Sequence, residues 1–224
     1  MNGMSAAEWL APVVLSLRVS FLASVFVFVA GVAAAWGMSL VRFRGKTLVE
    51  TVFLMPLVLP PTVVGFVLLV GLGRRSALGE LAQWLFDKPI VFTWQAAVIA
   101  AAVVAFPLAY QTMKVGFASV DRDLQDAARS MGATEWQLLT HVLLPLARRS
   151  LATAYVLGFA RGLGEFGATL MIAGNIPGKT QTVPTAIYVA VDSGRMAAAW
   201  WWAGSVIVVS YLLLLLVPRN DSDS

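Results

Sequence analysis

The amino-acid sequence predicts an all-α membrane protein that crosses a bilayer about five times. Composition is the first observation: 59% of the residues are hydrophobic, 12% are charged, and the mean hydropathy is +0.79. A soluble domain carries about 25% charged residues. The second observation is the spacing of the charges, which fall in clusters between long neutral runs. A spanning helix needs about 20 mostly apolar residues, and these runs reach that length.

Four of the neutral runs qualify directly as spans, whereas a fifth, residues 150–174, contains Arg161 and Glu165. A charge facing lipid costs about 2.5–3.5 kcal/mol at a helix centre, so both side chains should face protein or water. We expect one transmembrane domain over residues 1–219, with a disordered tail over 220–224. The expected spans are residues 13–40, 48–73, 91–113, 150–174 and 196–218, with a long surface loop at 114–149.

The composition also excludes several classes of function. Residues 1–17 carry Glu8 but no Lys or Arg, which is unlike a secretory signal, so the first apolar run should remain as a membrane helix. With no cysteine and one histidine, the sequence offers no disulfide, thiolate metal site or His-rich metal site. The basic residues flank spans instead of forming one stripe, so nucleic acid is not an expected partner. No catalytic, metal-binding or cofactor-binding residue is predicted.

The distribution of Lys and Arg predicts the orientation in the membrane. With the N-terminus outside and the C-terminus inside, more basic residues flank the inner span ends than the outer ones. Arg74 and Arg75 oppose this rule, because they fall in an outer loop, residues 74–92, whose aromatic side chains such as Trp84 suit the interface. The predicted inner residues are Arg42, Arg44, Lys46, Lys114, Arg122, Arg129, Arg148, Arg149 and Arg219, and the outer ones are Arg74, Arg75, Lys88, Lys179 and Arg195.

The second span carries three prolines, Pro56, Pro60 and Pro61, in the stretch LMPLVLPPTVVG. Proline removes a helix hydrogen bond and clashes with the preceding turn, so a straight helix is not expected. Broken backbone inside a membrane persists only where protein or a water-filled cavity satisfies its polar groups. The break is therefore either a structural kink or part of a pathway through the protein.

A polar, helix-patterned segment, DAARSMGATEWQLLTHVLLP (residues 126–145), interrupts the apolar pattern. Apolar residues recur at helical spacing up to Gly132, which should end the helix because glycine adopts the left-handed conformation of a C-terminal cap. Thr134 and Gln137 match the S/T-x-x-E/Q capping box and open a second helix, which Pro145 should end. The pattern predicts two short amphipathic surface helices that are unstable alone, with lipid or another protein covering their outer faces.

The residues that set the spacing of this segment are Asp126, Ala127, Ala128, Gly132, Val142, Leu144 and Pro145. This spacing resembles the EAA loop of ABC importer permeases, which reads E-A-A, three residues, G, nine residues, I, one residue, L-P. Asp126 stands where the family has Glu, and Val142 stands where it has Ile. In that family the loop is a coupling helix that docks into a groove on a cytoplasmic ATPase. The resemblance implies a type I ABC importer permease fold and adds Thr134 and Glu135 to the coupling residues.

A longer stretch, ARGLGEFGATLMIAGNIPGKTQTVPTAIY (residues 160–188), is similar to molybdate ABC transporter permease subunits, within the group that also contains sulfate and thiosulfate permeases. The part from Gly178 to Tyr188 favours molybdate, because the sulfate members differ after A-G-N-I-P. The resemblance implies a bacterial or archaeal cytoplasmic membrane and import of molybdate or tungstate, with sulfate or thiosulfate as the alternative. The implied partners are a second copy of this chain, two ABC ATPase subunits that hold ATP and Mg, and an extracytoplasmic molybdate-binding protein.

The stretch GNIPGKT looks superficially like a phosphate-binding loop. That loop needs four residues between its first glycine and the G-K pair, whereas three separate Gly174 from Gly178. A membrane span precedes the stretch where a strand would be required. The sequence therefore predicts a docking loop for an ATPase but no ATP site of its own.

Arg161 and Glu165 lie four residues apart among glycines that permit close helix approach. They are either a structural ion pair that locks helices together or part of a translocation path, in which Arg161 attracts a passing oxyanion. With Phe166, Pro60 and Pro61 they make up the candidate path or gate. An ion-coupled secondary transporter could use the same residues but would show inverted repeats, which the sequence lacks. A membrane scaffold could use the surface helices without transport.

Overall fold

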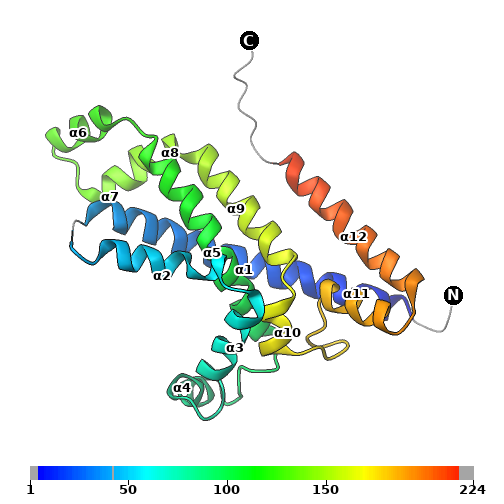
Figure 1. The fold of residues 1–224 in the computed structure, drawn as a ribbon. Helices are drawn as coiled ribbons and strands as arrows, with labels where there is room; N and C mark the ends of the chain where they lie inside the picture. Colours follow the sequence, from blue (N-terminus) through cyan, green and yellow to red (C-terminus); the bar gives the residue numbers. More distant parts are fainter. Residues whose placement is uncertain (1–4, 42, 217–224) are drawn as a thin grey trace.

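A computed structural model of the chain describes residues 5–41 and 43–216 (Figure 1). Every regular element in these ranges is helical, which confirms the predicted fold class. The predicted tail, residues 220–224, and the basic residues Arg42 and Arg219 lie outside the described residues. The helices are α1 (Ala6–Leu40), α2 (Lys46–Val58), α3 (Pro61–Gly71), α4 (Ala77–Phe86), α5 (Trp94–Ala118), α6 (Arg122–Ser130), α7 (Glu135–Leu138), the π-helical turn η1 (Leu139–Leu143), α8 (Leu144–Leu146), α9 (Arg148–Leu163), α10 (Gly167–Ala173), α11 (Val183–Asp192) and α12 (Met196–Leu215).

Three long helices, α1, α5 and α9, form the centre of the bundle because the residues between them are small. Ala100 and Ala105 on α5 are completely buried, and Ala23 on α1 is nearly so. A Cβ atom at Gly31 of α1 would lie only 2.8 Å from the sulfur of Met113 on α5. Small residues let membrane helices approach closely, and this close packing drives their association in lipid.

The described helices provide three to five candidate membrane spans by length and composition. α1, α5 and α12 are each long and apolar enough to cross a bilayer alone. α2 and α3 form one bent pair, with an angle of 115° between them. The helical segment Glu135–Leu146 and α9 form a second bent pair, with an angle of 78°. Counting each bent pair as one span gives five.

Two of the sequence-predicted spans are divided. Residues 48–73 separate at Leu59 and Pro60 into α2 and α3, which confirms that this span is not straight. Residues 150–174 separate into α9, which ends at Leu163, and α10, which begins at Gly167. The sequence indicated the first division through its prolines, whereas the second depends on contacts that form only in the folded chain.

Two short helices lie where the sequence indicated only loops. α4 occupies part of the outer loop at 74–92, and the Ser76 hydroxyl caps it by accepting the Gly79 N–H. α11 follows Thr182 and carries Pro184 in its first turn, where a missing N–H is tolerated. Helices of about ten residues give weak periodic signals in a chain that is apolar throughout.

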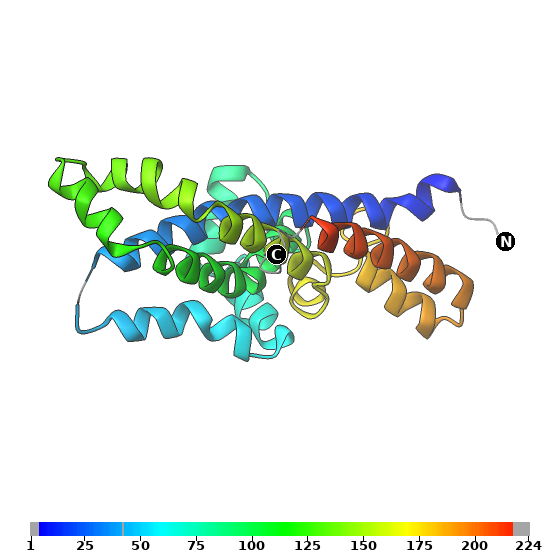
Figure 2. The same cartoon turned by 90° about the horizontal axis from the view of Figure 1, so that it is seen from above.

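The ends of the bundle differ in character. Figure 1 shows α6, α7 and α8 at one end, on the side to which the C-terminal end of α12 also points, and α4 at the opposite end. Seen from above in Figure 2, α2 runs along one flank, while α11 and α12 extend away from α6 and α7. None of the residues of α2 is buried, and α12 buries only Ala198, Ala199 and Trp202. These two helices therefore leave most of their apolar surface for lipid or another subunit.

Candidate functional site

The first candidate region is the surface loop formed by α6, α7, η1 and α8, which begins with a helix closed by a Schellman motif. The Gly132 N–H donates to the Arg129 carbonyl at 2.9 Å, and the Ala133 N–H donates to the Ala128 carbonyl at 3.1 Å. Gly132 has φ +88°, a conformation that glycine adopts without the strain imposed by a Cβ atom. The predicted glycine elbow is confirmed.

The second helix of the loop starts with the predicted capping box. The Thr134 hydroxyl accepts the Gln137 N–H at 3.3 Å, and the Gln137 side chain accepts the Thr134 N–H at 2.8 Å. Two N–H groups that a helix start leaves without partners are thereby satisfied. The sequence pattern therefore fixes both sides of the elbow through contacts within a few residues.

A branched ion pair closes the elbow. Arg129 on α6 donates to Asp126 at 3.1 Å and to Glu135 of α7 at 2.9 Å. The hydrogen bond with Glu135 raises the pKa of Arg129, and the same bond lowers the pKa of Glu135. Asp126 and Glu135, two of the predicted coupling residues, therefore hold α6 against α7 through one shared guanidinium, although all three side chains are partly exposed and the two ion pairs add little stability.

The prediction that Pro145 ends the second helix is wrong. Leu144, before the proline, has helical geometry with φ −61° and ψ −46°, and the helical path continues through α8 to Ala147. Pro145 falls in the first turn of α8, where its missing N–H is tolerated. The π-helical turn η1 precedes it, with the Leu144 N–H bonded to the Leu139 carbonyl, so the chain absorbs the proline by widening one turn.

Some apolar residues of the loop are packed against the bundle, and others stay exposed. Ala128, Leu138, Leu139 and Leu143 are buried in one cluster with residues at the adjoining ends of α1 and α5. Leu124, Met131 and Trp136 stay exposed, with 52%, 83% and 63% of their surface accessible, although the Trp136 ring also meets Trp36 of α1 with 5.9 Å between the centroids. Of the remaining predicted coupling residues, Ala127 and Pro145 are exposed, and Val142 and Leu144 are half-buried. The bundle thus holds the loop in place while several of its apolar side chains stay exposed.

The second candidate region is a place where two broken helices meet. α3 begins at Pro61 and α10 begins at Gly167, and a Cβ atom at Gly167 would lie 3.1 Å from the Pro61 Cβ. Further along, a Cβ atom at Gly65 would lie 2.7 Å from the Ala168 Cα, so the two backbones are almost in contact. We call this pair of adjoining helix starts the double break.

Glu165 occupies the double break as a buried carboxylate. Its Oε2 accepts a hydrogen bond from Arg161 at 3.0 Å, and its Oε1 accepts the Ala168 N–H at 2.8 Å. The Glu165 side chain is 2% exposed and that of Arg161 is 31% exposed. The carboxylate therefore joins the end of α9 to the start of α10, while the guanidinium of Arg161 remains partly accessible from outside. Phe166 lies beside Tyr188 of α11, with 5.5 Å between the ring centroids.

The structure thus brings Pro61, Arg161, Glu165 and Phe166 to one region, and it leaves Pro60 exposed at the bend between α2 and α3. It does not bring them to the surface loop, which Figure 1 places at the end of the bundle beyond α9. Gly65 was not singled out in the sequence, because no local pattern shows which glycine meets another backbone.

One polar contact outside both regions was also missed. Lys114 at the end of α5 donates to Glu50 of α2 at 2.7 Å, and the buried Tyr110 hydroxyl donates to the same oxygen at 3.4 Å. The contact fastens α2, which has little other packing, to α5. A signal was present, since both charges fall at span ends on the same predicted side of the membrane.

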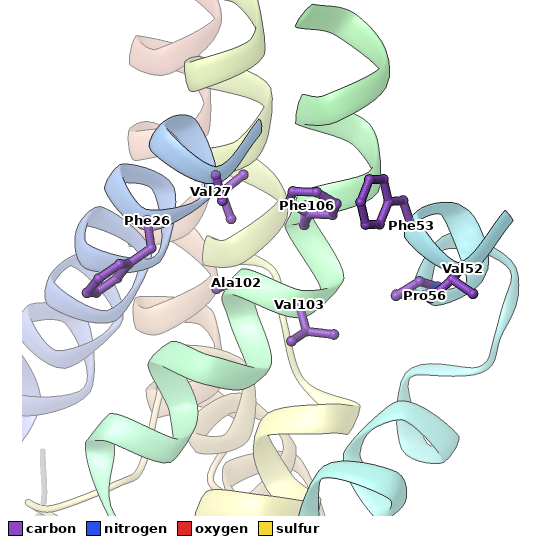
Figure 3. A pocket seen from close by; sticks show the side chains of 9 residues that line it. Phe26, Val27, Val52, Phe53, Pro56, Ala102, Val103 and Phe106 are labelled. Atoms are coloured by element: carbon purple, nitrogen blue, oxygen red, sulfur yellow. The ribbon is translucent and has the colours of Figure 1, made fainter. Parts of the chain in front are cut away.

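An apolar cavity of about 280 Å³ lies between α1, α2 and α5 (Figure 3). Figure 3 shows Phe53 of α2 facing Phe106 of α5, with Val52 and Pro56 along the same helix. The ring centroids of Phe53 and Phe106 are 5.4 Å apart. Side chains without charges or hydrogen-bond donors do not bind a hydrated anion, so this cavity is not an anion site.

A helical bundle with three to five candidate membrane spans, two of them bent, and a capped surface loop defines a multi-span membrane protein. The chain belongs to the family described as the binding-protein-dependent transport system inner membrane component, whose family model matches residues 27–220. The resemblance to ABC importer permeases expected from the sequence is thereby confirmed.

Relatives in sequence agree with this family. A Bacillus subtilis (strain 168) protein assigned as a molybdenum transport system permease is 56% identical over 193 residues, 86% of this chain and 85% of its own length. The molybdenum transport system permease of Escherichia coli (strain K12) is 44% identical over 186 residues, 83% of this chain and 81% of its own. A sulfate transport system permease of the same strain is 35% identical over 176 residues, 78% and 62% of the two chains.

Solved structures show the same fold. A bacterial ABC transporter that imports the acidic polysaccharide alginate matches with a TM-score of 0.71 at 16% identity, covering 95% of this chain and 77% of its own. An inward-facing methionine ABC transporter matches with a TM-score of 0.69 at 19% identity, covering 95% of both chains. The shared architecture is that of an ABC importer membrane subunit.

Proposed function

We propose that the chain is the membrane-spanning subunit of an ATP-driven importer of molybdate, the oxyanion of molybdenum, or of tungstate. The identity with two molybdenum transport permeases, 56% and 44% across most of the chain, carries this proposal. The sulfate permease is more distant at 35%, so sulfate or thiosulfate is the less favoured cargo. Family membership argues against an ion-coupled secondary transporter and against a scaffold without transport.

The proposed role of the surface loop is to receive an ATPase. Its support is a set of apolar side chains on the loop, Leu124, Met131 and Trp136, which stay exposed although Leu138, Leu139 and Leu143 of the same loop are packed into the bundle. A groove on a partner that buries such short helix faces is a common mode of recognition. In this proposal the ATPase subunits hold ATP and Mg, and this chain binds no cofactor and is not catalytic.

The proposed coupling follows from linkage between two conformations. ATP binding can bias an inward-open and an outward-open state only if the ATPase contacts the two states differently. The helical path from Glu135 through η1 and α8 into α9 joins the loop to the double break, since α9 ends at Leu163 beside Glu165. We infer that the double break, with Arg161, Glu165, Phe166, Pro60 and Pro61, is the moving part of the translocation path.

The proposed assembly contains two copies of this chain, two ATPase subunits and an extracytoplasmic molybdate-binding protein. Five spans are few for enclosing a path for a hydrated anion, and a dimer about a two-fold axis is the commonest closed arrangement of identical subunits in soluble oligomers. The uncovered apolar faces of α2 and α3 offer surface for a second copy. The proposed site is the cytoplasmic membrane of a bacterium or archaeon, with the N-terminus outside and the loop and C-terminus inside.

Reconstitution tests the cargo. The permease, its ATPase and its binding protein are placed in liposomes, and uptake of molybdate, tungstate and sulfate is measured with and without ATP inside. We expect ATP-dependent uptake of molybdate or tungstate. Uptake of sulfate alone would overturn the cargo, and uptake driven by an ion gradient without ATP would overturn the class of transporter.

Co-purification tests the docking surface separately. Met131→Glu places a charge on the exposed apolar face of the loop, whereas Ile176→Glu places the same charge on an exposed residue outside it. We expect the first variant to lose the ATPase during purification and the second to retain it. Equal retention by both variants would contradict docking at this face, whatever the cargo proves to be.

A further inference from the structure

A cavity of about 640 Å³ opens between the end of α3 and the segment that joins α4 to α5. Figure 1 shows these segments at the end of the bundle where α4 is found, away from the surface loop. Its lining residues are Leu69, Gly73, Arg74, Lys88, Pro89, Val91, Phe92 and Thr93. The cavity shares no residue with the double break or with the loop.

The far wall of this cavity is held in a strained conformation. Phe92 has φ +61°, which is rare for a residue with a bulky side chain, and its N–H donates to the Ile172 carbonyl at the end of α10 at 2.9 Å. Its ring lies against Gly174, where a Cβ atom would be 3.3 Å from the ring. Thr93 follows as the N-cap of α5. A wall fixed from three elements gives the cavity a preformed shape.

Two cations face this cavity without a counter-ion. Arg74 lies in the segment after α3 and Lys88 in the segment after α4, and both residues are exposed. None of the four ion pairs between described residues includes either of them. Two unpaired cations lining one cavity favour an anionic ligand between them. Arg74 also opposes the expected distribution of positive charge, and an anionic ligand gives a reason for its position.

The rest of the lining is apolar, which selects among anions. Leu69, Val91 and Phe92 offer hydrocarbon surface that a free inorganic oxyanion would leave in contact with water. α4 beside the cavity exposes an apolar face with helical spacing, Leu78, Leu81 and Leu85, together with Trp84 at 80% exposure. A helix with this face suits the boundary between headgroups and acyl chains. The ligand should therefore combine a phosphate with hydrocarbon.

We propose that this cavity binds one phospholipid with a net negative headgroup. Its phosphate lies between Arg74 and Lys88, and one acyl chain follows the wall formed by Leu69, Val91 and Phe92. The guanidinium can donate two parallel hydrogen bonds to phosphate oxygens, and the ammonium supplies a second charge. The site is independent of the transported anion, so it stands whether or not the importer carries molybdate.

Native mass spectrometry of the complete transporter tests this proposal. The complex is stripped of lipid in detergent and titrated with phosphatidylglycerol or with zwitterionic phosphatidylethanolamine of the same chain length. We expect one tightly retained phosphatidylglycerol, and we expect the Arg74→Gln/Lys88→Gln variant to retain it about 30-fold more weakly. Lys179→Gln is the matched control, because Lys179 is exposed but does not line the cavity.

A second variant and a second ligand separate the alternatives. Phe92→Ala removes part of the apolar wall, so it should weaken retention of the long-chain lipid and leave the preference for the anionic headgroup. Equal retention of phosphatidylglycerol by the double variant and by Lys179→Gln would overturn the site. Binding of free phosphate or molybdate to the lipid-free complex, lost in the double variant, would overturn the lipid and assign an inorganic oxyanion instead.

Discussion

The surface loop and the double break are held together in opposite ways. In the loop, the Schellman motif and the capping box each join residues no more than five positions apart. In the double break, the closest approaches join Pro61 to Gly167 and Gly65 to Ala168, residues that are about a hundred positions apart in the chain. One region is built from local hydrogen bonds at an exposed surface, and the other from backbone contact between two helices that are far apart in the chain.

The difference shows which interactions stabilise each region. Each local cap contributes about 1 kcal/mol, so the loop can lose one cap and still fold against the bundle. Two backbones in contact have no space for an added atom, and a buried carboxylate has no water to replace a lost partner. We therefore expect substitutions in the double break to affect folding and transport together, and substitutions in the loop to affect coupling first.

The largest effect should follow from Arg161→Ala. The substitution leaves the Glu165 carboxylate buried without its cation, which costs about 3 kcal/mol, the low end for breaking a buried pair because Arg161 is partly exposed. We expect uptake by the reconstituted transporter to be abolished and the thermal midpoint of the detergent-solubilised complex to fall, with the chain still inserted in membranes.

A double variant separates structure from transport at this position. Glu165→Gln combined with Arg161→Ala removes the unpaired charge and retains an amide oxygen that can accept the Ala168 N–H. If stability recovers while uptake does not, the guanidinium acts on the passing anion. Recovery of both would assign the pair a structural role alone, and an Arg161→Ala variant with normal stability and uptake would contradict both roles.

The next largest effect should come from Gly65→Ala on α3. The added methyl group meets the Ala168 backbone and the Met171 Cβ, both at 2.7 Å, so α3 and α10 must separate. Overpacking of this kind costs about 1–3 kcal/mol. Gly71→Ala on the same helix is the matched control, because nothing lies within 4 Å of its added Cβ. The free energies of unfolding of the two variants should differ by this amount, with a lower thermal midpoint for Gly65→Ala. Equal midpoints would show that the two helices do not pack as described.

Sequence reasoning anticipated the loop better than the double break for the same physical reason. Gly132 and Thr134 carry their structural signal within a few residues, so the elbow and the cap were readable directly. The prediction for Pro145 was wrong because the rule that the residue before a proline avoids helical geometry did not hold here. The widened turn η1 accommodates the proline, and the packing of Leu139 and Leu143 helps to hold that turn. The close contact at Gly65 could not be predicted, because nothing in the sequence of α3 indicates that α10 packs against it.

The division of the span at residues 150–174 shows the same limit. Arg161 and Glu165 were recognised as charges that had to face protein or water, and the structure pairs them. The role of Glu165 in receiving the Ala168 N–H depends on the helix stopping at Leu163, which the sequence pattern did not indicate. A charge inside an apolar span stands out in the sequence. The helix break that accommodates it depends on tertiary contacts, which the sequence pattern does not show.

Gly132→Ala should have a smaller effect that is confined to coupling. Alanine in the left-handed conformation costs about 1–2 kcal/mol, and here the cost falls on the elbow of the loop. Gly178→Ala is matched, since Gly178 has φ +71° and, like Gly132, has nothing within 4 Å of an added Cβ. We expect Gly132→Ala to reduce ATP-dependent uptake severalfold and Gly178→Ala to leave it unchanged. A similar loss in both would mean that backbone strain, and not the loop, limits transport.

The smallest effect should come from the cap itself. Thr134→Ala removes the hydroxyl that accepts the Gln137 N–H, which costs about 1 kcal/mol and falls on the four-residue helix α7. Ser5→Ala removes the same kind of capping box from α1, a helix of 35 residues that extensive packing keeps in place. We expect hydrogen exchange to quicken at Glu135, Trp136 and Gln137 in the first variant, with uptake reduced about twofold, whereas Ser5→Ala should leave uptake unchanged because only the first turn of α1 loosens. Unchanged exchange in Thr134→Ala would mean that packing of Leu138 and Leu139, and not the cap, holds this helix. The loop would then depend on tertiary packing, as the double break does, and the contrast between the two regions would not hold for α7.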